Sequence, residues 1–97
     1  MARGYWIAQV DVSDMEAYKQ YIAANGGPIS AHGGRFIIRN GQHVDVEGSM
    51  RSRIVVIEFP SYQAALDCYR SEAYQAIIPL RTSVAECDIT VIEGYDG

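Results

Sequence analysis

One carboxylate in the sequence is placed where it could act as a general base. Glu58 lies between Ile57 and Phe59, and a carboxylate among apolar residues either pairs with a cation or has its pKa raised by desolvation. A raised pKa at the edge of a cleft would suit proton transfer. We favour the ion pair, because structural pairs also perturb pKa values and arginines occur within the predicted strands. The candidate partners are Arg35, Arg39 and Arg53.

The other candidate for acid–base chemistry is His32, because an imidazole has its ordinary pKa near neutrality. It directly precedes Gly33 and Gly34, which are typical of the end of a helix. A histidine at a helix C-terminus most often interacts with the free carbonyl groups there, and we favour that interpretation. His32 and Glu58 are the residues that we predict as catalytic if the protein is an enzyme.

A second set of side chains is suited to binding a small anionic or aromatic ligand. Arginine can hold a carboxylate through two parallel N–H groups, and tyrosine combines an aromatic face with a hydroxyl. The residues predicted to bind substrate are Arg39, Arg53, Tyr69, Ser71, Tyr74 and Arg81. The ordinary alternatives are core packing for the tyrosines and helix capping for the serine. No nucleophile–base pair, phosphate loop or metal cluster is recognisable, so we expect neither a metal nor a cofactor.

The overall composition is typical of a soluble globular protein. The chain has 97 residues and a net charge of −4, which predicts one domain over residues 1–97 and argues against nucleic acid as a partner. No apolar run is long enough to span a membrane, and the N-terminus has no signal-peptide pattern. We therefore expect a cytoplasmic protein in which Cys68 and Cys87 are free thiols.

The elements that must position these residues alternate along the chain. β-Branched and alternating apolar residues predict strands over residues 5–12, 35–39, 53–59 and 87–93. After the first strand, Ser13 and Glu16 form a capping-box pattern for a helix. We expect this helix to weaken at residues 25–28 and to continue as a kinked segment to His32.

The second helical region follows the third strand. Ser61 is expected to cap its start, and Ser71 to break it and cap a second piece. Pro79 should produce a kink or a boundary in that second piece, because proline lacks the N–H that a helix interior needs.

Strict alternation in residues 35–39 would place the side chains of Arg35, Ile37 and Arg39 on one face of the sheet. Phe36 and Ile38 would lie on the other face. Beyond this strand, residues 43–47 alternate as a short arm, with their valines predicted to face inward and their polar residues outward.

The order of elements is β-α-β-β-α-β, which predicts a ferredoxin-like α+β fold with one antiparallel sheet and two helices on one face. The opposite face of the sheet would then be bare. Residues 53–59 are nevertheless apolar on both sides, and monomers rarely expose an apolar patch of that size. We therefore predict a homodimer that joins the bare faces of two sheets.

Five short motifs, taken in order, resemble domain-of-unknown-function family 1330. They are Gly33-Gly34-Arg35-Phe36-Ile37-Ile38-Arg39, Glu47-Gly48, Val55-Val56-Ile57-Glu58-Phe59-Pro60-Ser61, Ser71-Glu72-Ala73-Tyr74-Gln75-Ala76 and Val91-Ile92-Glu93-Gly94. The resemblance covers nearly the whole chain. It implies a dimeric α+β barrel and no established activity. The chain departs from the family pattern at Pro79, and it has His32 where an aromatic residue is expected.

Proteins of the same barrel architecture include cofactor-free monooxygenases, muconolactone isomerases, dehalogenating enzymes and stress-response proteins. This is analogy at the level of fold. Three hypotheses follow for the function. The first is a cofactor-independent enzyme, of monooxygenase or isomerase type, acting on an aromatic or carboxylate metabolite. The second is a small-molecule binding or stress-response protein without turnover, and the third is a purely structural dimer.

Overall fold

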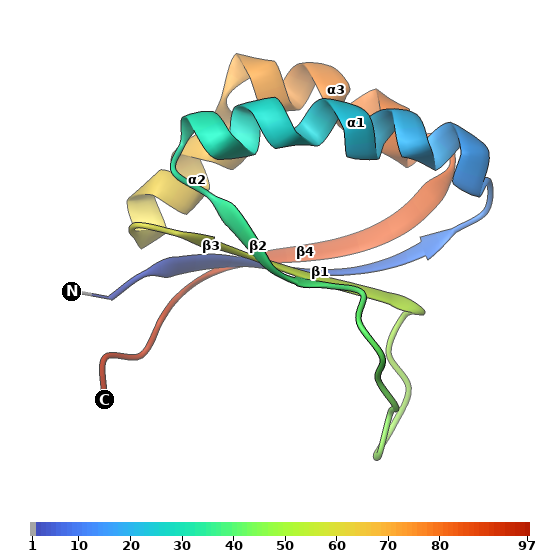
Figure 1. Cartoon of the computed structure of the whole chain (residues 1–97), viewed down its shortest axis with the longest axis horizontal. Helices are drawn as coiled ribbons and strands as arrows, with labels where there is room; N and C mark the ends of the chain where they lie inside the picture. Colours follow the sequence, from blue (N-terminus) through green and yellow to red (C-terminus); the bar gives the residue numbers. More distant parts are fainter. Residues whose placement is uncertain (1) are drawn as a thin grey trace.

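The computed structural model describes residues 2–97. The elements, in chain order, are β1 (Gly4–Val12), α1 (Met15–Ala31), β2 (Arg35–Arg39), β3 (Arg53–Phe59), α2 (Tyr62–Arg70), α3 (Glu72–Thr82) and β4 (Ala85–Glu93). Figure 1 shows the helices together on one face of the sheet, which we call the helix face. The described residues place no helix on the opposite face, which we call the open face.

The four strands form one antiparallel sheet in the order β2-β3-β1-β4. This is the order expected when the two halves of a β-α-β-β-α-β chain interleave. The predicted ferredoxin-like α+β fold is therefore confirmed, with the second helical region divided into α2 and α3.

The core between the helices and the helix face is built largely from aromatic rings. Trp6 is only 2% exposed, and its ring centroid lies 4.9 Å from that of Tyr74 and 5.3 Å from that of Phe59. The indole N–H of Trp6 donates to the carbonyl oxygen of Ala65 at 2.8 Å. The ring is therefore fixed in orientation, and truncating a buried tryptophan of this kind costs about 3–5 kcal/mol.

Helix α1 starts one residue later than the sequence pattern predicts. Asp14, not Ser13, is the N-cap, and its Oδ1 accepts from the amide of Ala17 at 3.2 Å. Ser13 is engaged elsewhere, because its amide and its hydroxyl both donate to the carbonyl oxygen of Val84. The predicted capping box was therefore wrong, since a contact distant in sequence uses the serine and an aspartate caps equally well.

The predicted weakening of the first helix at residues 25–28 was also wrong. Helix α1 continues through Pro28, with Asn25 and Ile29 buried against the rest of the fold. Packing of this face outweighs the missing amide of one proline. The helix ends where predicted, because Gly33 has a φ of 76° and its amide donates to the Ser30 carbonyl at 3.0 Å.

The two serine caps of the second helical region are confirmed. Ser61 accepts from the amide of Ala64 at 3.0 Å, and Ser71 ends α2 and accepts from the amide of Tyr74 at 3.2 Å to start α3. Pro79 lies inside α3 and forms no boundary. Within residues 2–97, no helix has both the length and the apolar character needed to cross a membrane.

A β-bulge in β2 changes which side chains share a face. Phe36 pairs with Ile57 and Ile38 pairs with Val56, so Ile37 is an extra residue in the ladder. One extra residue reverses the alternation of everything after it. The prediction that Arg39 shares a face with Arg35 was therefore wrong, because Arg39 follows the bulge and lies on the helix face with Phe36.

The predicted arm at residues 43–47 is not a strand but part of a long loop, residues 40–52. Val44 and Val46 do not face inward, because they are 78% and 86% exposed. The loop extends on the side of the sheet away from the helices (Figure 1). The reason is that the β2–β3 ladder ends at Asn40, whose amide donates to the Ile54 carbonyl at 2.7 Å.

Candidate functional site

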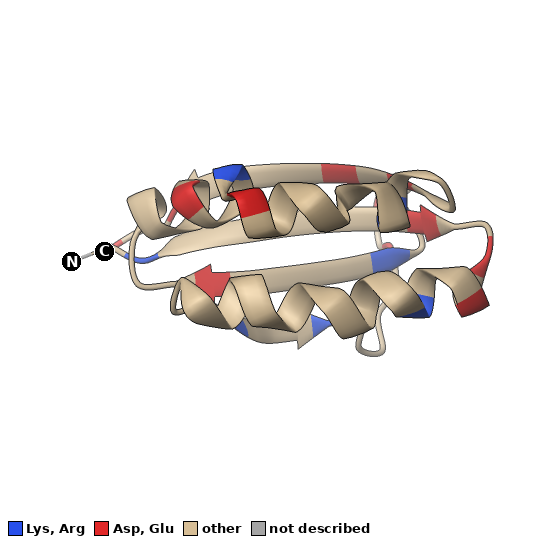
Figure 2. Cartoon of the chain, turned by 90° about the horizontal axis from the view of Figure 1, so that it is seen from above, with Lys and Arg blue, Asp and Glu red and all other residues tan. Residues whose placement is uncertain are grey.

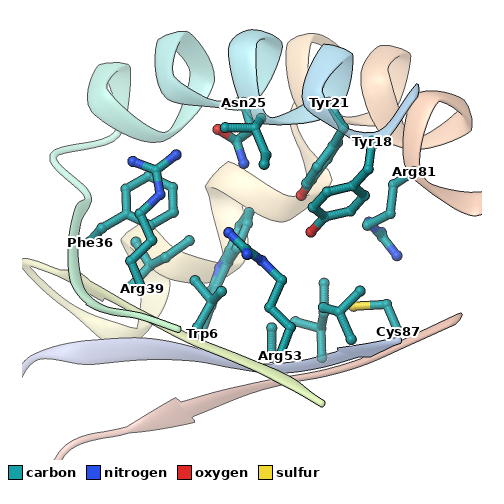
Figure 3. A pocket seen from close by; sticks show the side chains of 15 residues that line it. Trp6, Tyr18, Tyr21, Asn25, Phe36, Arg39, Arg53, Arg81 and Cys87 are labelled. Carbon is teal, nitrogen blue, oxygen red and sulfur yellow. The ribbon is translucent and has the colours of Figure 1, made fainter. Parts of the chain in front are cut away.

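A narrow cavity lies between α1, α3 and the helix face of the sheet (Figure 3). Its water-accessible volume is about 30 Å³, which is room for about two water molecules. Most of its walls are aromatic or aliphatic. Its polar lining residues are Tyr18, Tyr21, Asn25, Arg39, Arg53, Arg81 and Cys87.

The strand ladder places two arginines at this cavity. Arg53 pairs with Val10 and Arg39 pairs with Val55, and Val10 and Val55 are buried on the helix face. Arg53 and Val55 are two residues apart on β3, so Arg39 and Arg53 are diagonal neighbours across two strands. Long side chains reach each other at that spacing. In Figure 3 both side chains rise from the sheet toward α1.

The third arginine reaches the cavity from the helices. Arg81 comes from the last turn of α3 and is only 6% exposed. Its guanidinium carbon lies 5.5 Å from the ring centroid of Tyr21, and that of Arg53 lies 5.7 Å from the ring centroid of Tyr18. Tyrosines on α1 therefore form cation–π contacts with arginines from both layers.

No carboxylate balances these positive charges. No Asp, Glu or His lines the cavity, and within residues 2–97 none forms an ion pair with Arg39, Arg53 or Arg81. Lys19 is the last charged residue of α1, which is uncharged over residues 20–31 (Figure 2). Burying a charge costs several kcal/mol, whereas a cation–π contact returns about 0.5–2 kcal/mol. An anion in the cavity would offset the part of the burial cost that the cation–π contacts leave.

Three buried polar atoms at this cavity have no hydrogen-bond partner in the described part of the chain. They are the Nε donors of Arg53 and Arg81 and the Oδ1 acceptor of Asn25. Buried polar atoms are nearly always paired, because an unpaired one costs about 1–3 kcal/mol. Three of them on one cavity indicate that a bound molecule completes the site.

Two tyrosine hydroxyls are joined beside the cavity. The hydroxyl oxygens of Tyr21 and Tyr74 are 2.5 Å apart. Burial, with the neighbouring Tyr21 hydroxyl, holds the pKa of Tyr74 far above its usual value. In one hydrogen bond between two hydroxyls, one donates and the other keeps its own proton. Tyr21 lines the cavity, so when Tyr74 donates, the proton of Tyr21 is available to a ligand.

The remaining ionisable groups of the cavity are neutral at pH 7. Burial raises the pKa of Tyr18, with a further contribution from Tyr21. Burial also raises the pKa of the Cys87 thiol, although the nearby Arg81 guanidinium acts in the opposite direction. The lining therefore offers cations and neutral donors, which stabilise negative charge but do not abstract a proton.

Glu58 lies on the open face and does not line the cavity. Its Oε1 accepts from Arg35, with Nη2 at 2.9 Å and Nε at 3.0 Å, and its Oε2 accepts from the Tyr5 hydroxyl at 3.1 Å. The Arg35 guanidinium holds the pKa of Glu58 below its usual value, against the opposing effect of burial. Of the three arginines considered as partners, Arg35 forms the ion pair.

The other predicted site residues are also away from the cavity lining. His32 is the C-cap residue of α1, and its Nδ1 donates to the Pro28 carbonyl at 2.9 Å. Ser71 caps α3, and Tyr69 packs against Trp6 at 5.9 Å between ring centroids. The structure brings Arg39, Arg53 and Arg81 together and connects Tyr74 to them through Tyr21. It separates them from His32, Tyr69, Ser71 and Glu58.

Besides Cys87 on β4, the sequence analysis missed three polar lining residues on α1: Tyr18, Tyr21 and Asn25. A signal was present, because they follow one another at helical spacing along α1. An asparagine within an otherwise apolar helical stripe is a buried polar group that needs a partner. The neighbouring Gly26, Gly27 and Pro28 drew attention to a helix break instead. Among residues 2–97 no cluster of His, Cys, Asp and Glu could hold a metal ion.

Residues 3–95 match the family described as "Domain of unknown function (DUF1330)". None of the curated proteins is similar enough in sequence to count as a match.

Several solved structures share the fold. A protein of unknown function from Rhodopseudomonas palustris is 15% identical, with a TM-score of 0.77 over 99% of this chain and 85% of that chain. SnoaB, a cofactor-independent oxygenase from Streptomyces nogalater, is 5% identical, with a TM-score of 0.71 over 100% of this chain and 97% of that chain. A conserved protein from Methanosarcina mazei is 16% identical, with a TM-score of 0.58 over 98% and 95%. At these identities the likeness concerns the fold alone.

Proposed function

The chain belongs to the DUF1330 family, and we propose that it binds a small aromatic or carboxylate anion in the cavity between its helices and its sheet. The observation that carries this proposal is the set of three arginines around one cavity without a carboxylate. A protein selected for packing alone would pair these charges or replace them with apolar residues. Aromatic walls next to guanidinium groups favour a planar organic anion over an inorganic ion.

A ligand larger than water needs more room than the present 30 Å³. Arg39 can provide it, because this side chain is exposed and belongs to an edge strand. Arg53 and Arg81 are more buried and hold their positions against tyrosines. We therefore assign Arg53 and Arg81 to anchoring the anion and Arg39 to the entrance.

Binding can be tested by thermal unfolding and isothermal titration with a panel of aromatic and aliphatic carboxylates. A ligand raises the apparent stability in proportion to the logarithm of its concentration above Kd. Arg53→Gln and Arg81→Gln should each weaken binding by about tenfold or more, because a charge-assisted hydrogen bond is lost. Arg70→Gln is the control, since Arg70 is exposed on α2. Equal binding by all four proteins would refute the assignment.

A second candidate function is turnover of the bound anion, in a cofactor-independent reaction of isomerase or monooxygenase type. The observation that favours it is the Tyr21–Tyr74 hydroxyl pair, which leaves one proton available at the cavity. Solvent water would accept a carbon-bound proton of the ligand, Tyr21 would donate its own proton to the oxyanion that forms, and both transfers would reverse when the product forms. SnoaB, named a cofactor-independent oxygenase, supports this only as an analogy of fold.

Proton transfer can be followed separately from binding. In D₂O, nuclear magnetic resonance would detect exchange of carbon-bound protons in any keto acid that binds. Tyr21→Phe should retain binding, because the ring stays, and should abolish protein-catalysed exchange. If the wild-type protein binds acids but catalyses no exchange in any of them, the non-catalytic binding function stands and this type of turnover does not.

We also propose that the protein works as a cytoplasmic homodimer joined through the open face. One cross-strand line on this face runs through Ile38, Val56, Ile7 and Thr90. Ile7 and Ile38 are 38% and 47% exposed in the single chain. Apolar side chains in the middle of a sheet face support association with a second copy.

A further inference from the structure

The three unpaired atoms of the cavity are not all of one kind, and this difference restricts the ligand. The Nε atoms of Arg53 and Arg81 are donors and need acceptors, whereas Oδ1 of Asn25 is an acceptor and needs a donor. A simple carboxylate or aromatic anion has acceptors only. It would satisfy the arginines and leave Asn25 unpaired.

Asn25 is held where it cannot find that donor within the protein. It lies on the face of α1 that packs on the fold and is 5% exposed. The indole N–H of Trp6, another lining group, already donates to Ala65. The Tyr21 hydroxyl bonds Tyr74, and no hydrogen bond joins it to Asn25. Figure 3 shows Asn25 descending from α1 into the cavity, above the guanidinium group of Arg53.

We infer that the ligand is an organic acid that also carries a hydroxyl or N–H group, with the acid held by the arginines and the donor given to Asn25. This inference rests on the proposed function, since it names the class of anion for the same cavity. The required ligand has its two polar groups on different sides of an apolar body. 3-Hydroxybenzoate and 4-hydroxybenzoate have this arrangement.

The alternative occupant for the contact to Asn25 is water, because the cavity has room for it. If the water molecule stays in place, a hydroxyl on the ligand would not change the binding affinity. A ligand hydroxyl that replaces it would strengthen binding. The two cases therefore differ in one measurable quantity, which is the affinity ratio within a pair of acids that differ by one hydroxyl.

The test is isothermal titration with such matched pairs: benzoate against its 3- and 4-hydroxy derivatives, with the 2-hydroxy derivative, whose hydroxyl is adjacent to the carboxylate, as a control. The wild-type protein should bind one hydroxylated member at least about tenfold more tightly than its partner. Asn25→Leu should remove this ratio while still binding the simple acid. Gln20→Leu, an exposed change on the same helix, should keep it. Asn25→Asp should also keep it, because a carboxylate accepts the same hydrogen bond.

The possible results separate the two proposals. If every acid binds as well as its hydroxylated partner, the inference about Asn25 is wrong and the anion site remains. If no acid binds to the wild-type protein, both are wrong. Loss of the hydroxyl preference in both Asn25→Leu and Asn25→Asp would show that the amide presents its NH₂ group to the ligand, and would also overturn the inference. Thermal unfolding without ligand checks folding, and Asn25→Leu should be at least as stable as the parent.

Discussion

Glu58 and Arg81 are both largely buried charged side chains, but only Glu58 has an opposite charge in contact with it. The carboxylate of Glu58 lies 2.9 Å from Nη2 of Arg35. Within residues 2–97, Arg81 forms no ion pair with an acid and lies beside the tyrosines Tyr21 and Tyr74. Removing a paired charge leaves its partner uncompensated, and removing an unpaired charge relieves a cost. The two side chains should therefore respond to neutralisation in opposite directions.

For Glu58, we expect Glu58→Gln to lower the thermal unfolding midpoint at pH 7. Its pKa is depressed in the folded state, mainly by Arg35. The stabilisation is therefore present above the unfolded-state pKa of about 4.3 and is lost as the pH falls through the folded-state value. Parent and variant should differ at pH 7 and converge near pH 3. The double variant with Arg35→Gln should recover part of the loss, and a parent-like Glu58→Gln protein at pH 7 would contradict the structural role.

For Arg81, we expect the opposite result. Arg81→Met keeps most of the side-chain volume and removes a buried charge that has no acid to pair with. The variant without ligand should be as stable as the parent or more stable, and it should no longer bind carboxylates. Thermal unfolding with and without the acid that binds best measures both effects. A strongly destabilised Arg81→Met protein would mean that the arginine serves the fold itself.

At the scale of single residues, the chemical types of the side chains predicted more of the cavity lining than their positions in the sequence did. Arg39, Arg53 and Arg81 could be selected because a fork-shaped cation in a strand or helix end suits an anion. Asn25 and Tyr21 could not, because their importance depends on what faces them across the cavity. The role of Glu58 was open in the sequence for the same reason. Its neighbours along β3 are apolar, but its cross-strand neighbours are Tyr5 and Arg35.

The bulge at Ile37 is the element-scale feature that decides the composition of the cavity. Without the bulge, regular alternation over residues 36–39 would place Phe36 and Arg39 on opposite faces of the sheet. With it, the guanidinium carbon of Arg39 lies 4.2 Å from the ring centroid of Phe36. No residue type in this strand signals a bulge. Strict alternation therefore assigned Arg39 to the wrong face of the sheet.

Deletion of Ile37 tests this geometry. The deletion removes the extra residue and leaves Phe36, Ile38 and Arg39 opposite their present partners on β3. We expect the variant to fold and to bind acids about as well as the parent. Loss of acid binding in the folded deletion variant would contradict the assigned register.

Helix boundaries were predicted well where a glycine or serine made local contacts, and badly where tertiary packing decided. Gly33 and Ser71 act on their own neighbours in sequence. The path of α1 through Pro28 depends on burial of Asn25 and Ile29. The helix propensity of each residue does not include the free energy of that burial.

On the scale of the whole molecule, the strand order followed from the order of the elements because few topologies satisfy the rules for connections. That the open face joins a second copy stays a prediction, since it concerns a second chain. Ile7 lies on the central strand β1, opposite Val56 on β3 and Thr90 on β4. This position makes it the most direct probe of the proposed dimer.

We expect Ile7→Glu to convert a dimer into monomers. A carboxylate in the middle of an apolar interface would be buried without a partner, at a cost of several kcal/mol. Sedimentation velocity at micromolar concentration should show the parent at twice the monomer mass and the variant at the monomer mass. Gln63→Glu, an exposed change on α2, serves as a control of the same charge. A monomeric parent would overturn the dimer.

The chain is a thin slab, 38 × 36 × 17 Å along its principal axes. A slab of one sheet and one layer of helices leaves a large share of its area on the open face, and the proposed dimer would bury that area between two chains. Unfolding would then separate two molecules, and mass action makes such a transition depend on concentration. The thermal midpoint of the parent should rise with protein concentration over two orders of magnitude, and that of Ile7→Glu should stay constant. The amount of protein in the cell would thereby set how much of it is folded.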